Sequence, residues 1–324
     1  MACWIAWRAS SGDPRSVPET DAPEDEFGLI DRFFAGLDAG PDVTLGVGDD
    51  AALLQLRPGE SLAVSVDTMV EGRHFPPHSS GELVAFRAVA AAVSDLAAMG
   101  ARPLAMTLAI SLPTADESWL TAFRQGLEDA VAHFALPLVG GDVTRGPLTL
   151  SVQVMGAVGT RLLRSGARPG DQLYVSAALG DAAAGLAVIE GRLRPSPEQG
   201  QALRERFWRP LPDLVLGQAL ADQASAAIDI SDGLLADAAH LARASGVGLR
   251  IDSAAIPLSP SLSAAVPREQ ALAWALTGGE DYVLCFTAPA GAVLPAGVHR
   301  IGEVFAGTGV DCDMLPPSTG YRHF

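Results

Sequence analysis

Residues 82–112 read ELVAFRAVAAAVSDLAAMGARPLAMTLAISL, and this stretch decides the fold class of the 324-residue chain. Its alanine-rich part, 82–98, predicts a long helix, and Gly100 is a favourable residue just beyond a helix C-terminus. The apolar run 103–112 predicts a strand. A long helix followed directly by a strand indicates a sheet that is covered by helices.

The alternation of helices and strands continues on both sides of this stretch. Before it, apolar residues at helical spacing predict a helix that starts at Glu26, and short apolar runs predict strands at 51–56 and 61–67. After it, the same patterns predict one helix and two strands, at 116–134, 136–140 and 148–158. The chain is therefore predicted to have an α+β fold with α/β-type layers.

A Gly-, Pro- and Arg-rich link, RLLRSGARPG at 161–170, marks a predicted domain boundary. We expect a disordered leader at 1–25, an N-terminal domain at 26–160 and a C-terminal domain at 161–324. The C-terminal part alternates again, with predicted strands and helices at 171–176, 180–190, 199–207, 213–222, 226–230, 233–244, 248–252, 281–287 and 298–304.

All 22 basic residues are arginines, so the chain contains no lysine. This excludes the P-loop, the protein-kinase site and Schiff-base chemistry, because each of them needs a lysine. The formal net charge of −16 argues against a nucleic-acid partner, and against a polyanionic substrate unless divalent cations intervene. No apolar run approaches the roughly 18 residues of a membrane span, so we expect no membrane partner. Three cysteines without ligand-like spacing, Cys3, Cys285 and Cys312, favour a cytoplasmic location.

Aspartates recur directly after apolar or small-residue segments. Taken alone, each is more often a turn former or a helix cap than a ligand, and Asp232 could simply cap the helix that follows it. Their recurrence beside Gly and Ser instead indicates several hard oxygen ligands, which suit Mg²⁺. These residues are Asp49, Asp50, Asp67, Asp95, Asp142, Asp229 and Asp232.

Two diglycine elements, GGD at 140–142 and GGED at 278–281, would let backbone amides approach an anion in place of the missing lysine. Each alone is more often a turn. By the same standard, His74 and Arg164 taken singly are more often solvated loop residues than members of a site.

In their order, these segments resemble the thiamine-monophosphate kinase family. Its superfamily also holds aminoimidazole-ribonucleotide synthetase, selenophosphate synthetase and a hydrogenase-maturation dehydratase. The resemblance covers about 26–324, and the HF of the DTMVEGRHF segment, the GGEDY element and the terminal HF distinguish this family from its relatives. The matching segments are EFGLI at 26–30, GVGDDAALL at 46–54, SVDTMVEGRHF at 65–75, SDLAAMGARP at 94–103, GGDVTRGPL at 140–148, RSGARPGD at 164–171, AIDISDGLLAD at 227–237, TGGEDYVLCF at 277–286 and GYRHF at 320–324.

The resemblance implies an enzyme that transfers the γ-phosphoryl group of ATP to thiamine monophosphate, with several Mg²⁺ ions and often K⁺. It also implies a homodimer, in which the mixed sheets of the N-terminal domains, with their covering helices, pair into a barrel-like sheet, and a C-terminal α/β sandwich. Because the acceptor is itself an anionic phosphate, no general base is required, and we expect direct in-line transfer assisted by metal ions.

The resemblance assigns residues to three roles. Val66 stands where related sequences often carry Thr, so only its backbone carbonyl could bind a metal. The final GYRHF lacks the acidic residue that commonly precedes HF. The implied metal ligands are Asp50, Ser65, Val66, Asp67, Asp95, Asp142, Asp229 and Asp232; the implied ATP contacts are Gly141, Asp142, Arg164 and Ser231; the implied substrate contacts are His74, Glu280 and Tyr321.

Two alternative functions stay open at this point. Another ATP-using member of the superfamily would act on a different acceptor, and a metal-dependent phosphohydrolase would fit the aspartate cluster equally well. A Ca²⁺-stabilised binding domain has less support, because no spaced calcium loop is present.

Overall fold

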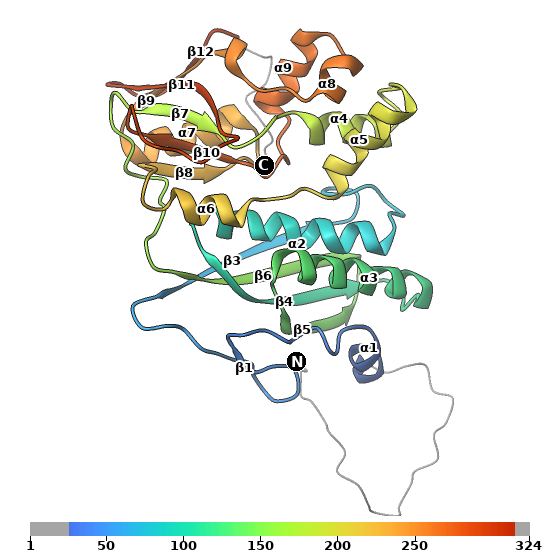
Figure 1. Ribbon diagram of the computed structural model, residues 1–324. Coiled ribbons are helices and arrows are strands. Elements are labelled where there is room, and N and C mark those ends of the chain that lie inside the picture. Colours follow the sequence, from blue (N-terminus) through green and yellow to red (C-terminus); the bar gives the residue numbers. More distant parts are fainter. Residues whose placement is uncertain (1–25, 315–324) are drawn as a thin grey trace, which may run out of the picture. The chain divides into compact units, whose positions relative to one another are not determined.

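The computed structural model describes residues 26–314, which form two compact units (Figure 1). Within that range the first unit comprises 26–92 and 103–157, and the second comprises 93–102 and 158–314. The predicted leader at 1–25 and the terminal GYRHF lie outside the described residues.

The first unit is built on a four-stranded sheet with the strand order β3-β6-β4-β5. Strands β4 and β5 run parallel, and helix α3 connects them, as a parallel pair requires. The elements are β3 (Ser61–Val70), β4 (Arg102–Leu112), α3 (Glu117–Phe134), β5 (Leu138–Arg145) and β6 (Thr149–Val158).

Helices α2 (Gly81–Ala98) and α3 lie along one face of this sheet (Figure 1). The alternation of β6 points Leu150, Val152 and Val154 to the buried side, and α3 buries Leu120, Phe123 and Leu127. Asp116 caps α3, because its side chain accepts the backbone N–H of Trp119. Helix α1 (Glu26–Phe33) and a two-stranded hairpin of β1 (Val43–Leu45) and β2 (Leu53–Leu54) complete the unit.

Strand β3 is an edge strand whose two faces differ. Leu62, Val64 and Val66 alternate along one face and are 48%, 53% and 60% exposed. Ser65 and Asp67 lie on the other face, where they are partly buried. The period-2 geometry of a strand therefore separates an apolar face from a polar one.

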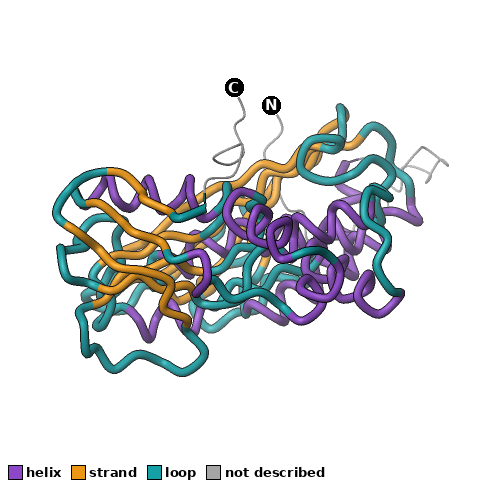
Figure 2. The backbone as a smooth tube through the Cα atoms, turned by 90° about the horizontal axis from the view of Figure 1, so that it is seen from above, coloured by secondary structure: helices purple, strands orange, loops and turns teal. Residues whose placement is uncertain are grey.

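The second unit is built on a six-stranded sheet with the order β12-β9-β11-β7-β10-β8. Its pairs are antiparallel except for β12 and β9, and the strands lie side by side in a curled layer (Figure 2). The strands are β7 (Gln172–Val175), β8 (Ala226–Asp229), β9 (Gly248–Ile251), β10 (Leu284–Ala288), β11 (His299–Phe305) and β12 (Gly309–Cys312).

Helices complete the second unit. Leu173, Val175, Leu249 and Ile251 of the sheet form one buried cluster with residues of α7, among them Leu241. The helices are α4 (Asp181–Ile189), α5 (Pro197–Trp208), α6 (Leu214–Leu220), α7 (Leu234–Ser245), the 3₁₀ turn η1 (Ser253–Ala255), α8 (Pro260–Ala265) and α9 (Arg268–Thr277).

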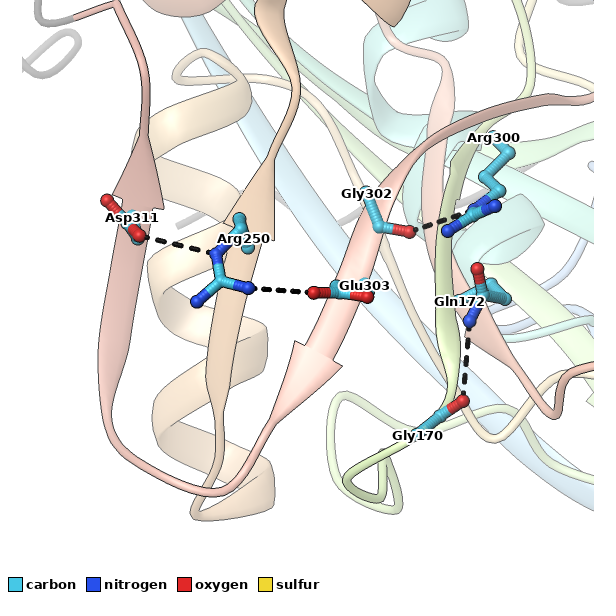
Figure 3. A network of polar contacts seen from close by, with 7 residues as sticks. All are labelled: Gly170, Gln172, Arg250, Arg300, Gly302, Glu303 and Asp311. Atoms are coloured by element: carbon cyan, nitrogen blue, oxygen red, sulfur yellow. Dashed lines mark hydrogen bonds and ion pairs between the residues drawn. The ribbon is translucent and has the colours of Figure 1, made fainter.

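Arg250 links three strands at the edge of this sheet (Figure 3). From β9 its Nη1 lies 2.8 Å from Glu303 Oε1 on β11, and its Nε lies 3.4 Å from Asp311 Oδ2 on β12. All three side chains are exposed, so each pair contributes at most about 1 kcal/mol to stability.

The predicted α+β class is confirmed, and several element bounds differ from the prediction. The strand predicted at 136–140 extends through the glycines to Arg145, and the strand predicted at 51–56 is reduced to Leu53–Leu54. Strand β12 and helices α8 and α9 were not predicted. None of the helices in residues 26–314 combines the length and the hydropathy needed to span a bilayer.

Candidate functional site

In the first unit, Asp50 lies in the tight turn at the tip of the β1–β2 hairpin. Its backbone N–H donates to Asp49 Oδ1 at 2.8 Å, and the Asp50 side chain is exposed. Gly48, at φ 138°, supplies a backbone conformation that other residues rarely adopt. The N–H of Val47 donates to Asp38 Oδ2 at 3.1 Å, which anchors the start of the turn.

His74 folds back onto the end of β3, which also carries Ser65 and Asp67. Its ring Nδ1 accepts the backbone N–H of Val70 at 3.0 Å. The backbone N–H of His74 donates to the carbonyl oxygen of Val70, also at 3.0 Å. The partly buried ring is therefore held by the chain, unlike a solvated loop histidine.

The first diglycine element lies in β5 and does not form a turn. Gly141 pairs with Leu108 of β4, and Asp142 pairs with Ala109. A Cβ on Gly141 would collide with the carbonyl oxygen of Leu108 and would lie 2.7 Å from its carbonyl carbon. Glycine is therefore needed for the close approach of two parallel strands, a reason that the diglycine pattern alone does not reveal.

A pocket of about 520 Å³ lies where β4 and β5 end, just after Asp142. Asp142 stands on the outer strand β5, whereas Asp67 stands on the opposite outer strand, with β6 and β4 between them. The pocket is lined by Leu29, Leu112, Pro113, Thr114, Ala115, Val143, Thr144 and Arg145.

In the second unit, a buried hydrogen bond joins two of the acidic motifs. Ser94 Oγ donates to Asp229 Oδ2 at 2.8 Å, across 135 residues of sequence. Ser94 is fully buried and Asp229 is 5% exposed, while Asp95, the next residue along α2, stays partly exposed. The contact brings the SDLAAMG and AIDISDG segments together at the end of β8.

The segment Ile230–Gly233, which we call the 230–233 loop, joins β8 to α7 and carries Ser231 and Asp232. The N-cap of α7 is Gly233, which makes no side-chain cap bond, so Asp232 does not cap the helix as the simpler interpretation suggested. Burial, followed by the negative charges of Asp229 and Asp232, raises the pKa of Asp237 to about 7. The carboxylates of Asp229 and Asp232 thus lie close enough to Asp237 to disfavour its charged form.

The second diglycine element packs against the 230–233 loop. The N–H groups of Glu280 and Tyr282 donate to the carbonyl oxygens of Ser231 and Ile230 at 2.8 and 2.9 Å. Glu280 and Tyr282 have φ angles of 61° and 51°, which are strained for residues other than glycine.

Asp281, in the middle of this element, binds the start of helix α4. It accepts the N–H groups of Gly180 at 2.8 Å and Ala182 at 3.3 Å. Burial raises the pKa of Asp281 to about 7, and the neighbouring charge of Asp181 adds to the shift. This carboxylate therefore ties the Glu280 segment to a second helix.

Two residues that the resemblance assigned, Arg164 and Tyr321, are not part of the contacts described above. Arg164 is exposed, and Ser245 Oγ at the end of α7 donates to its carbonyl oxygen at 3.1 Å. Tyr321 lies outside the described residues. Ser94, Asp237 and Asp281 lie in motifs that the sequence analysis quoted, but it assigned none of them a role. Asp281 belongs to the second diglycine element, and Asp237 is an acidic residue in the first turn of a helix.

Two family models match the chain, in the order of its two units. "AIR synthase related protein, N-terminal domain" matches residues 48–158, and "AIR synthase related protein, C-terminal domain" matches 168–312. The fold and the paired acidic motifs thus define an AIR synthase-related protein.

Similar proteins of known function show to which family within this class the chain belongs. Thiamine-monophosphate kinase of Escherichia coli (strain K12) is 48% identical over 268 residues, which is 82% of each chain. The chain belongs to the thiamine-monophosphate kinase family.

Solved structures agree with this assignment. The crystal structure of thiamine-monophosphate kinase from Stenotrophomonas maltophilia K279a is 43% identical, with a TM-score of 0.79 over 84% of this chain and 92% of that one. AaThiL complexed with AMPPCP and TMP is 32% identical, with a TM-score of 0.77 over 92% of this chain and 97% of that one.

Proposed function

We propose that this protein phosphorylates thiamine monophosphate to thiamine diphosphate with ATP, by direct in-line transfer assisted by Mg²⁺. The observation that carries the proposal is the buried bond from Ser94 to Asp229, which brings two acidic motifs together in one unit. The family adds support, because curated relatives are thiamine-monophosphate kinases and a related structure holds AMPPCP, an ATP analogue, with TMP. ATP as donor and cysteines without ligand-like spacing support a cytoplasmic location.

The donor atoms at the assigned positions fit Mg²⁺. They are carboxylate and hydroxyl oxygens and, at Val66, a backbone carbonyl oxygen, all of which are ligands that this hard cation prefers. Among residues 26–314, no three His, Cys, Asp or Glu side chains form a metal-binding group by themselves. Mg²⁺ usually takes one or two carboxylates per ion and completes its shell with water and substrate phosphate. The proposed ligands are Asp50, Ser65, Val66, Asp67, Asp95, Asp142, Asp229 and Asp232, and K⁺ is a further candidate ion.

When bound, the metal would screen the repulsion between donor and acceptor phosphates and stabilise the charge of the transition state. The side chains and backbone of the protein would hold the two substrates in position for the transfer. Arg164 and Ser231 are proposed to contact the nucleotide, together with the backbone at Gly141 and the carboxylate of Asp142. His74, Glu280 and Tyr321 are proposed to contact thiamine monophosphate, and no side chain needs to remove a proton, since the acceptor is already anionic.

A coupled assay tests this function. The full chain is incubated with ATP, Mg²⁺ and thiamine monophosphate, and the products are separated by chromatography. We expect thiamine diphosphate and ADP in equal amounts, and no product when EDTA removes the divalent ions. ATP hydrolysis without thiamine diphosphate would favour the phosphohydrolase, and no turnover with this acceptor would favour a relative with another acceptor.

We also infer that the protein is a homodimer joined through β3. Leu62, Val64 and Val66 expose a row of apolar side chains on an edge strand. A second copy presents the same row, so a two-fold axis would cover both at once. This agrees with the barrel-like pairing that the family resemblance implies.

Replacing Val64 by Glu should abolish the dimer, because each copy would bring a charge into the apolar contact. Sedimentation should show wild type at twice the chain mass and the variant at the chain mass. Val293→Glu is the matched control, since Val293 is 86% exposed in a loop of the second unit and should leave the dimer intact. A monomeric wild type, or a dimeric Val64→Glu variant, contradicts the inference.

A further inference from the structure

The 230–233 loop is held by one carboxylate oxygen. Asp237 Oδ2 accepts the backbone N–H groups of Ser231, Asp232 and Gly233 at 3.0, 3.0 and 3.1 Å. Asp237 is the fourth residue of α7 and is 3% exposed. Three backbone N–H groups thus converge on one buried oxygen, which fixes the backbone of the loop at three consecutive residues.

The opposite side of the loop is held as firmly. The carbonyl oxygens of Ile230 and Ser231 accept the N–H groups of Tyr282 and Glu280. Those two residues keep positive φ angles, a conformation that costs about 1–3 kcal/mol each and persists only where the surroundings impose it. The backbone of the loop is therefore engaged by the protein on both sides.

The side chains that remain partly exposed in this loop are those of Ser231 and Asp232. The loop amides are directed at Asp237, so they are not available to a phosphate. Asp232 makes no cap bond to α7, since Gly233 is the N-cap and has none. The loop therefore leaves the side chains of Ser231 and Asp232 accessible to a ligand, while its backbone N–H groups are occupied by Asp237.

We propose that Asp237 is a positioning residue, whose carboxylate fixes the 230–233 loop so that Asp232 and Ser231 face the metal–nucleotide complex. This inference rests on the proposed function, which makes Asp232 a metal ligand and Ser231 a nucleotide contact. In this arrangement Asp237 itself would contact neither metal nor substrate, because its Oδ2 is directed at the loop backbone. Groups that orient a metal ligand typically change metal affinity by about 10- to 100-fold when they are removed.

Asp237→Asn and Asp237→Ala test the proposal in the full chain, with Mn²⁺ as the probe. Electron paramagnetic resonance measures Mn²⁺ binding in the presence of AMPPCP, and kinetics measure the Mg²⁺ dependence of turnover and the KM for thiamine monophosphate. We expect Mn²⁺ affinity to fall about 10- to 100-fold, with a matching rise in the Mg²⁺ requirement. The KM for thiamine monophosphate at saturating Mg²⁺ should change less than twofold.

Asp171→Asn is the matched control. Asp171 is also a buried carboxylate, 6% exposed, and it accepts the N–H of Arg168 at 2.9 Å and the hydroxyl of Ser225 at 2.6 Å. Ser225 directly precedes β8, whereas the 230–233 loop follows it, so the control lies at the other end of the strand. This variant should lose stability and keep wild-type Mn²⁺ affinity.

The outcomes separate the inference from the proposed function. Folded Asp237 variants with wild-type Mn²⁺ affinity, or an equal loss of affinity in Asp171→Asn, overturn the positioning role. If wild type neither binds Mn²⁺ with AMPPCP nor makes thiamine diphosphate, the proposed function fails. In that case, amide hydrogen exchange at 231–233 in the metal-free protein tests whether Asp237 fixes the backbone of the 230–233 loop. Faster exchange in Asp237→Ala than in Asp171→Asn supports this role, and equal exchange contradicts it.

Discussion

Replacing Asp67 or Asp95 by Asn is expected to lower kcat on the order of 10³-fold, which corresponds to about 4 kcal/mol of transition-state stabilisation. Both carboxylates are proposed metal ligands, and Asn keeps the shape while it removes the charge. Because the donor and acceptor are both polyanions and the chain has a net charge of −16, the proposed metal ions carry most of the charge that would neutralise their repulsion. The loss should therefore appear in kcat and not only in the Mg²⁺ requirement.

The fold should survive both substitutions. Asp67 and Asp95 are partly exposed, and Asn has nearly the same shape as Asp, so we expect a change of about 1 kcal/mol or less in the free energy of unfolding. Circular dichroism and thermal unfolding of each variant provide this check. Asp222→Asn is the control for charge alone, because Asp222 is an exposed acid outside the proposed site and should retain wild-type kcat. Near-normal turnover of either site variant at limiting Mg²⁺ would remove that residue from the ligand set.

Gly141→Ala should cause the largest loss of stability, about 3 kcal/mol or more in the free energy of unfolding. The added Cβ would meet the carbonyl oxygen of Leu108, and the parallel pairing of β4 and β5 leaves that backbone no room to move. Urea denaturation of the full chain measures the effect. Asp142 follows Gly141 directly, so the same change should also displace a proposed ligand and lower turnover.

Gly140→Ala is the matched control for this prediction. A Cβ on Gly140 has Thr107 Cγ2 as its nearest neighbour, at 3.9 Å, which is an ordinary contact. Its stability should therefore stay within about 1 kcal/mol of wild type. Equal stability of the two alanine variants would show that β4 and β5 can separate locally, and would contradict the close-approach role of Gly141.

Long periodic elements were predictable from sequence because their own residues determine them. Helix α2 and strand β4 were expected within one residue of their observed bounds, since an alanine-rich run with a terminal glycine and an apolar run carry strong local signals. Strand β5 was expected to stop at its first glycine. It continues because β4 provides a pairing partner, and glycine is required at that contact.

In the candidate site too, some features were predictable from local sequence and others depend on tertiary contacts. The aspartate motifs were visible along the chain, and so was the resemblance to the family that the comparisons then showed. The bond from Ser94 to Asp229 joins residues 135 positions apart, and no local pattern could predict it. Whether Asp232 caps a helix was also undecided by sequence, because a cap and a ligand have the same neighbours.

The sequence by itself determined which chemical groups are available: no lysine, a net charge of −16 and aspartates that recur beside Gly and Ser. Those features exclude lysine-based phosphate binding and favour a metal-based one. Only the tertiary structure decided which carboxylates are exposed to a ligand and which are buried and fix the backbone that carries them. The physical reason is that Asp232 and Asp237 differ in burial and in the donors around them, and both properties arise when β8, α7 and the Glu280 segment pack together.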